Sequence, residues 1–274
     1  MLKNSRLYNA MCSFRRCFLF IYLPVSKSMC IFALQFVWLF FMETNEAVNP
    51  HESIVVLENV SLSHGGEPLL SAVNLRLGPG EFVYLIGKSG TGKTSLLRSL
   101  YAAQSVDCGK VEVCGIDVTH IRRRRIPLLR RQIGFVFQDF RLLDDRDVFS
   151  NLAFVLRATG WKRADIKPQV EKTLAAVGIQ HKADAMPSRL SEGERQRVGI
   201  ARALVGNPKL ILADEPTGNL DPVTSGEIMQ LLVDVGHQFG TTMLISTHDF
   251  MMIDRFPARV VVCENGTLVD TEAQ

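Results

Sequence analysis

The sequence predicts an α/β fold in which a mostly parallel sheet is covered by helices. Short apolar runs, each the length of a strand, alternate with segments that have helical apolar spacing. The run at 82–86 is apolar on both faces, and the runs at 209–214 and 241–247 have apolar centres, LILA and MLI, so all three are predicted to be buried strands. Alternation of this kind indicates parallel strands joined by helical crossovers.

The body of the chain is expected to open and close with antiparallel strands. IVVLENVSL (54–62), SAVNLRL (71–77) and EFVYLIG (81–87) are rich in β-branched and other apolar residues, and together they are expected to form the antiparallel opening. Near the other end, Asn265-Gly266 lies between two short apolar runs, and this dipeptide is a strong signal for a two-residue hairpin turn.

Four segments are predicted to be helical. TSLLRSLYAA follows the strand at 82–86, and the segment 192–206 is a second helix. The third, 148–178, is a helical insert in which Gly160 and Pro168 are expected breaks. The fourth, near 223–239, connects two buried strands.

Residues 1–42 differ from the rest of the chain. Of 31 basic and 28 acidic residues in the sequence, five basic and no acidic ones lie in this leader. Its apolar run at 29–42 is shorter than the ~17–25 residues that a membrane helix needs, and no small-residue cleavage site follows. Two interpretations stay open: an upstream start wrongly included, with Met29 or Met42 as the true start, or a membrane-touching segment.

The remaining residues are close to neutral in charge, which argues against nucleic-acid binding driven by net charge. Three of the six cysteines lie in the leader, and the others are Cys108, Cys114 and Cys263. These three have no metal-ligand spacing and offer little basis for a disulfide framework, so a reduced, cytosolic compartment fits best.

A glycine-rich loop follows the strand at 82–86 and opens the next helix. It reads GKSGTGKT and fits G-x-x-x-x-G-K-[ST] in the strand–loop–helix context that this phosphate-binding motif requires. Its backbone N–H groups and the helix N-terminus are expected to face phosphate oxygens, Lys93 to reach the β- and γ-phosphates, and Thr94 to bind Mg²⁺. The predicted nucleotide-binding residues of the loop are Gly87, Lys88, Ser89, Gly90, Thr91, Gly92, Lys93 and Thr94.

Polar residues also follow other predicted strands. Asp214 ends a strand where it can hold Mg²⁺, and Glu215 comes next, where a carboxylate can polarise an attacking water. Such a pair alone is also typical of a surface turn, and the glycine-rich loop upstream favours the catalytic interpretation. His248 and Gln138 each follow another apolar run. Because strand ends on one edge of such a sheet converge on the ligand crevice, we expect these side chains to meet there.

Ser191 and Glu194 form a capping-box pattern at the start of the helix 192–206. One interpretation is a good helix cap and nothing more. The other is a second anion site made by the Ser191 hydroxyl and the helix N-terminus. A second copy of the chain would complete such a site. In two chains arranged head to tail, the glycine-rich loop of each chain faces the Ser191 helix cap of the other.

Taken together, these motifs resemble the ATP-binding cassette (ABC) family over about residues 54–270. GKSGTGKT resembles its Walker A loop, Gln138 its Q-loop, LSEGE its signature, LILADE its Walker B strand, GNLD its D-loop and His248 its switch histidine, in the family's order. The resemblance implies a P-loop NTPase fold with a RecA-like, mostly parallel core, an antiparallel β subdomain and a helical subdomain at about 140–206 that carries the signature. It also implies hydrolysis of ATP with Mg²⁺ as cofactor.

The resemblance extends to individual site residues. It implies that the catalytic residues are Glu215, His248, Lys93 and Gln138. The implied Mg²⁺ ligands are Thr94, Gln138 and Asp214. Outside the loop, implied nucleotide contacts are His64, Ser191, Gly193, Glu194 and Asp221. The family's ATP lies between the Walker A loop of one subunit and the signature of the other, which implies a homodimer.

The chain departs from the family pattern at two positions. Glu192 stands where the signature usually has glycine, and a carboxylate there would repel a γ-phosphate unless it points away, as we expect. His64 stands where an aromatic residue, often tyrosine, usually stacks on adenine. An imidazole offers less area for stacking, so reduced affinity for ATP is the hypothesis.

Within the family, PLLRRQIGFVFQDFRLLDDRDVFSNLAF most resembles the cell-division subgroup. Members of that subgroup are peripheral ATPases on the cytoplasmic face of the inner membrane, with an FtsX-like integral membrane protein as partner. The tract ADEPTGNLD is shared with the ATPases of lipoprotein-release and macrolide-efflux transporters, which form the alternative.

Other functional classes fit less well. The basic run IRRRRIPLLRR (121–131) is either a solvated face or a contact for anionic lipid or the membrane partner; it lacks the interleaved aromatics of a nucleic-acid site. A soluble ABC protein acting on DNA or ribosomes is disfavoured, because no sustained heptads separate Thr94 from Leu190 and the chain has one cassette. A nucleotide-gated scaffold without turnover is disfavoured by the presence of Glu215 and His248.

Overall fold

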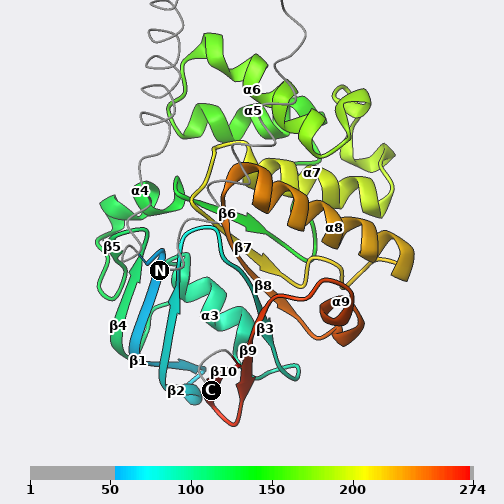
Figure 1. Ribbon diagram of the computed structural model, residues 1–274. Coiled ribbons are helices and arrows are strands. Elements are labelled where there is room, and N and C mark those ends of the chain that lie inside the picture. The colour runs from blue at the N-terminus through cyan, green and yellow to red at the C-terminus, as the bar shows by residue number, and fades with distance from the viewer. Residues whose placement is uncertain (1–52, 272–274) are drawn as a thin grey trace, which may run out of the picture. The chain divides into compact units, whose positions relative to one another are not determined.

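The computed structural model describes residues 53–271, so the interpretations of the leader at 1–42 fall outside the described residues. The described part contains two β-sheets with helices packed around them (Figure 1). Within this part, no helix combines the length and the apolar character needed to cross a membrane.

The first sheet is antiparallel, with the strand order β2-β1-β4-β5. Buried and less buried residues alternate along β1 and β2, because one face of this sheet packs into the core. The antiparallel opening is therefore confirmed for the first two predicted strands, 54–62 and 71–77. It is wrong for the third, 81–87, which lies in the other sheet and pairs in parallel, because both of its faces are buried. The strands are β1 (Val55–His64), β2 (Glu67–Leu77), β4 (Cys108–Val113) and β5 (Ile116–Asp117).

The second sheet has the order β10-β9-β3-β8-β7-β6, and all its strands are parallel except β10. The turn between β9 and β10 consists of Asn265 and Gly266 with φ of 50° and 74°, the conformation that a two-residue hairpin of this kind needs. The predicted hairpin and the parallel core are thus confirmed. The strands are β3 (Phe82–Ile86), β6 (Ile133–Val136), β7 (Leu210–Asp214), β8 (Thr242–Thr247), β9 (Arg259–Glu264) and β10 (Thr267–Asp270).

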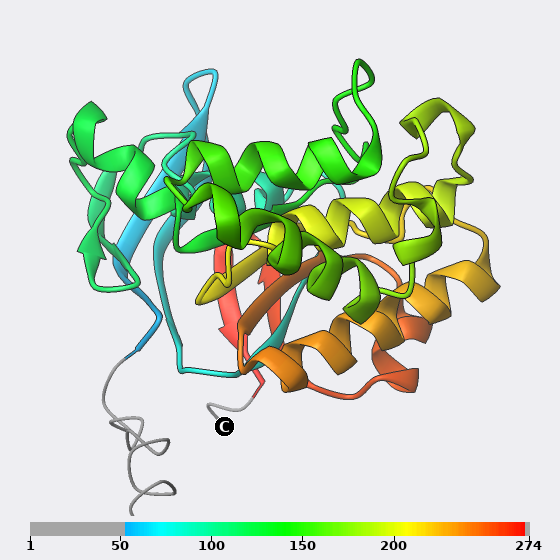
Figure 2. The same cartoon turned by 90° about the horizontal axis from the view of Figure 1, so that it is seen from above.

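Helices cover both faces of the second sheet. α3 packs between the two sheets, and α7 and α8 lie on the other side of the second sheet. α5 and α6 pack on α7, farther from the strands (Figure 1 and Figure 2). The helices are α3 (Lys93–Leu100), α4 (Ile126–Arg130), α5 (Val148–Ala158), α6 (Arg163–Ala176), α7 (Glu192–Leu204), α8 (Pro222–Phe239) and α9 (Phe250–Arg255). Short 3-10 turns are η1 (Arg123–Arg125), η2 (Gln180–Lys182) and η3 (Pro187–Arg189).

Strand β3 explains why its sequence is apolar at every position. Tyr84 and Ile86 belong to the core shared with α5–α8, whereas Val83 and Leu85 belong to the core shared with α3 and the antiparallel sheet. Successive side chains of a strand point to opposite faces, so a strand buried on both sides needs apolar residues throughout.

The prediction of a helix break at Pro168 is wrong, whereas α5 does end just before Gly160. Pro168 lies inside α6, in its second turn. It removes only the hydrogen bond to the carbonyl of Ala164, and the buried side chains of Ile166 and Val170 hold the turn against the core. Tertiary packing therefore outweighs the local preference of proline.

Tyr84 gives the fold a measurable response to high pH. Its hydroxyl donates a hydrogen bond to the carbonyl of Phe256 at 2.9 Å, and burial raises the pKa of Tyr84 to about 12 from 10.0. Because the folded-state pKa is raised, this contribution to stability is full below pH 10 and is lost as the pH rises toward 12.

Tyr84→Phe should lower the free energy of unfolding by ~1 kcal/mol at neutral pH. It should also make the free energy of unfolding fall less steeply above pH 10 than in the wild type. Denaturant titrations of both proteins at several pH values test this, and parallel declines would contradict it.

Candidate nucleotide-binding and hydrolysis site

The phosphate-binding loop connects the end of β3 to the start of α3. Gly87, Gly90 and Gly92 have φ of 153°, 82° and 102°. A Cβ atom on Gly87 would come within 2.3 Å of the carbonyl oxygen of Cys263 on β9. The loop is therefore held so close to β9 that only glycine fits at position 87.

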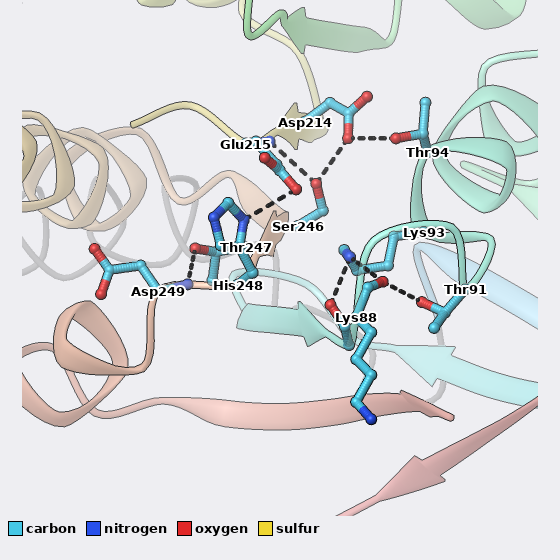
Figure 3. A network of polar contacts seen from close by, with 11 residues as sticks. Lys88, Thr91, Lys93, Thr94, Asp214, Glu215, Ser246, Thr247, His248 and Asp249 are labelled. Carbon is cyan, nitrogen blue, oxygen red and sulfur yellow. Dashed lines mark hydrogen bonds and ion pairs between the residues drawn. The ribbon is translucent and has the colours of Figure 1, made fainter. Parts of the chain in front are cut away.

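Lys93 is 5% exposed, and its ammonium group is turned into the loop (Figure 3). Its Nζ donates hydrogen bonds to the carbonyls of Gly87 at 2.7 Å and Lys88 at 2.9 Å. Within residues 53–271 it forms no ion pair. A buried cation that contacts only neutral acceptors is poorly compensated, so the loop has the electrostatic character that suits a phosphate group.

Three oxygens from three different elements meet beside the loop. The hydroxyls of Thr94 on α3 and Ser246 on β8 both donate to Oδ1 of Asp214, at 3.0 and 2.8 Å. Asp214 ends β7 directly opposite Ser246 in the parallel ladder. Hydroxyl and carboxylate oxygens are the ligands that Mg²⁺ prefers, so this group fits the expected ion.

Glu215 and His248 form a pair at the same edge of the sheet (Figure 3). Nδ1 of His248 lies 3.2 Å from Oε1 of Glu215, and the two side chains are 63% and 22% exposed. Glu215 has φ of 46°, a strained conformation for a residue with a side chain. Its N–H donates to the carbonyl and the hydroxyl of Ser246, both at 3.1 Å, and these bonds hold the strained backbone.

Gln138 follows β6 and reaches the same edge. A Cβ atom on Gly218 would lie 3.1 Å from Nε2 of Gln138 and 3.4 Å from Oε2 of Glu215. The amide and the carboxylate therefore approach each other with Gly218 between them. The backbone carbonyl of Gln138 also accepts a hydrogen bond from the side chain of Asn219 at 3.1 Å.

His64 ends β1 and is exposed. Together with Ser89, Gly90 and Lys93 of the loop it lines a cavity of 280 Å³. His64 and the phosphate-binding loop therefore share one cavity.

The signature residues lie elsewhere. Ser191 caps α7 in a capping box with Glu194: the Ser191 Oγ accepts from the N–H of Glu194 at 3.3 Å, and Glu194 Oε2 accepts from the N–H of Ser191 at 2.9 Å. That backbone bond lowers the pKa of Glu194, and Lys182 pairs with its carboxylate at 3.1 Å. Neither Ser191 nor Gly193 lines the cavities beside the phosphate loop in the described part of the chain.

Gly193 and Asp221 are linked through Thr224 at the start of α8. A Cβ atom on Gly193 would lie 2.7 Å from Cγ2 of Thr224, so α7 and α8 touch at this point. Asp221 caps α8 by accepting hydrogen bonds from the N–H groups of Val223 and Thr224, at 3.0 and 3.1 Å. The bonds to Thr224 lower the pKa of Asp221.

The structure thus gathers most predicted residues at the carboxyl edge of the sheet, while the signature residues and Asp221 cluster at the start of α7 and α8. Sequence reasoning missed Ser246, whose hydroxyl links Asp214 to the backbone of Glu215. The register of β7 against β8 would have been the signal for it. Cys263, whose thiol donates to the carbonyl of Thr91 at 3.1 Å, was also missed.

Comparisons with known proteins agree with this geometry. The ABC transporter family matches residues 70–218, more than half of the chain. The chain is 43% identical over 223 residues to the cell division ATP-binding protein FtsE of Streptococcus pneumoniae, covering 81% of this chain and 96% of that protein. It is 40% identical over 220 residues to the methionine import ATP-binding protein MetN of Carboxydothermus hydrogenoformans, covering 79% of this chain and 65% of that protein.

Among solved structures, the dimeric ATP-binding cassette MJ0796, in a post-hydrolysis state with ADP and Pi, has a TM-score of 0.69 and 33% identity. The superposition covers 78% of this chain and 96% of that one. The fold, the family match and these identities together show that the chain belongs to the ABC transporter family, is an ATPase, and is most like its FtsE members.

Proposed function

We propose that this ATPase works as a head-to-tail homodimer in which each ATP lies between the phosphate loop of one copy and the α7 cap of the other. The observation that carries the proposal is the position of Ser191. It is exposed at a helix N-terminus, a ready site for an anion, yet it shares no cavity with its own phosphate loop within residues 53–271. The dimeric state of MJ0796, with ADP and Pi bound, supports the dimer in this proposal.

Binding of ATP is assigned to the residues around the loop. The loop N–H groups and the ammonium of Lys93 hold the phosphates, and His64 stacks on the base. Mg²⁺ supplies neutralisation of charge on the phosphate oxygens when it is bound. Thr94, Asp214 and Gln138 would hold it, and Ser246 orients Asp214 by its hydrogen bond at 2.8 Å.

Hydrolysis is assigned to the Glu215–His248 pair. The Glu215 carboxylate accepts a proton from the attacking water as the water oxygen bonds to the γ-phosphorus and the bond to the bridging oxygen of the ADP leaving group breaks. His248, 3.2 Å away, orients that carboxylate and the γ-phosphate. The partner's Ser191 hydroxyl and the N-terminal N–H groups of its α7 stabilise charge that develops on the γ-phosphoryl group.

A mixing experiment tests the shared site. Lys93→Ala disables the loop, and Ser191→Asp keeps the helix cap while placing a negative charge where the γ-phosphate would lie. Each variant alone should be inactive. Mixed, they form heterodimers with one intact site, so turnover should recover to as much as about a quarter of the wild-type value. No recovery after subunit exchange, checked with differently tagged chains, would mean that the site lies within one copy.

We further propose an FtsX-like integral membrane protein as the partner, with this subunit held peripherally on the cytoplasmic face of the inner membrane. The 43% identity to FtsE supports this choice. A groove between the edge strand β6 and helices α5 and α7 combines apolar walls with arginines, so it suits an apolar segment that carries an acidic residue. Among its lining residues are Phe135, Phe137, Val155 and Arg202. It lies next to Gln138, so an occupant would contact the segment that carries this residue.

Affinity purification of Glu215→Gln from solubilised membranes with ATP, followed by mass spectrometry, tests the partner. An FtsX-like protein is the expected result. If a lipoprotein-release, efflux or import permease is found instead, the ATPase activity stands but the protein drives a transporter. Of these alternatives, import is supported by the 40% identity to MetN.

A further inference from the structure

Five arginines form an unpaired basic surface that the ATPase site does not use. We define the arginine patch as Arg122, Arg123, Arg124, Arg125 and Arg131. All five are exposed, and none forms an ion pair within the described residues. No acidic residue occurs in the sequence between Asp117 and Asp139, so this segment itself supplies no counter-charge to the patch.

The patch is built on a short, well-anchored projection. The turn η1 runs directly into α4, whose Leu129 is fully buried in the core. Next to it, Leu128 is 50% exposed among the arginines. A sixth arginine, Arg130, differs from the patch, because its guanidinium lies 4.6 Å from the Tyr101 ring centroid and donates to two backbone carbonyls.

Closely spaced like charges repel one another, and this repulsion is relieved when anions lie against them. A basic cluster of this size around an exposed apolar side chain matches the surface of an anionic bilayer, where headgroups supply phosphate and the interface accepts a leucine. Nucleic acid fits less well. The segment 118–132 contains no Phe, Tyr or Trp for base stacking, and the nearby Tyr101 ring is covered by Arg130.

The position of the patch also favours a membrane. Arg131 lines the same groove as Val155 of α5 and Arg202 of α7. If that groove holds the membrane partner, as proposed above, the patch faces the lipid next to it; this step rests on the proposed function. We propose that the arginine patch binds anionic phospholipid headgroups directly, in addition to any contact with the membrane partner.

Vesicle flotation of the full chain tests the proposal. The patch variant carries Arg122→Gln, Arg123→Gln, Arg124→Gln and Arg125→Gln; the matched control removes four other exposed charges by Arg157→Gln, Lys162→Gln, Arg163→Gln and Arg189→Gln. At low salt, the patch variant should bind vesicles of phosphatidylcholine with phosphatidylglycerol at least about tenfold more weakly than wild type. The control should bind like wild type, and any contribution of residues 1–42 is common to all three proteins.

Equal losses in the two variants, or a loss on pure phosphatidylcholine vesicles as well, would overturn the proposal. The same proteins titrated with duplex DNA provide the other arm: a patch-specific loss of DNA binding with unchanged vesicle binding would assign the patch to nucleic acid. ATP turnover without membranes should be the same in the patch variant and the wild type. The lipid-binding proposal can therefore be overturned by vesicle flotation while the proposed homodimeric ATPase still stands.

Discussion

Glu215→Gln is expected to abolish most ATP turnover while ATP binding is retained. The substitution keeps the size of the side chain but removes the base that accepts a proton from water, a loss of roughly 10²–10⁴-fold in kcat. The amide can still contact His248, which lies 3.2 Å away in the native pair, so the shape of the site is preserved. Phosphate release at saturating ATP measures the loss, and nucleotide titration measures the retained binding.

A carboxylate outside the site provides the control. Glu227 on α8 pairs with Arg197 at 3.0 Å, and Glu227→Gln removes the same charge from an exposed position. Its turnover should equal that of the wild type. Activity of Glu215→Gln above about a tenth of the wild-type value would show that another group accepts the proton.

Lys93→Ala should lower the affinity for ATP by about a hundredfold or more, because a buried cation makes strong charge-assisted hydrogen bonds to phosphate. Lys88 is the matched control in the same loop, because its predicted contact with the nucleotide is through its backbone N–H, which Lys88→Ala keeps. It is exposed, and its side chain extends away from Lys93 (Figure 3). Lys88→Ala should therefore change the affinity by less than about threefold. Isothermal titration of the three proteins with ATP and Mg²⁺ measures both effects.

The stability of Lys93→Ala separates a binding role from a structural one. Among the described residues, the Lys93 ammonium donates hydrogen bonds to two carbonyls, and its burial carries a desolvation cost. Removing it should therefore leave the melting temperature of the nucleotide-free protein nearly unchanged. A large fall in that temperature would instead make Lys93 a support of the loop.

Much of this fold follows from local pattern. β3 occupies the predicted residues 82–86, because a strand buried on both faces leaves an uninterrupted apolar run. Pro168 led to a wrong prediction because the hydrogen bond that proline removes is outweighed by the burial of α6 side chains in the core. That burial cannot be recognised from the residues around Pro168 alone. Secondary structure was therefore predictable where burial and local preference agree.

The site was predictable in outline and not in detail. Strand ends on one edge of a parallel sheet placed Asp214, Glu215 and His248 together. The contact between Glu215 and His248 also depends on a positive φ at a glutamate, which residue type does not predict. Ser246 was missed because its role depends on strand register, a long-range property.

The contact between Gly193 and Thr224 makes the starts of α7 and α8 one mechanical unit. Through Thr224 that unit includes Asp221, which ends the segment that begins at the chain's own Glu215. In the proposed head-to-tail pair, the same unit presents Ser191 to the nucleotide of the other copy. A movement at Glu215 of one copy would then shift Ser191 at the nucleotide of the other copy. Because both copies are alike, each site would be coupled to the other.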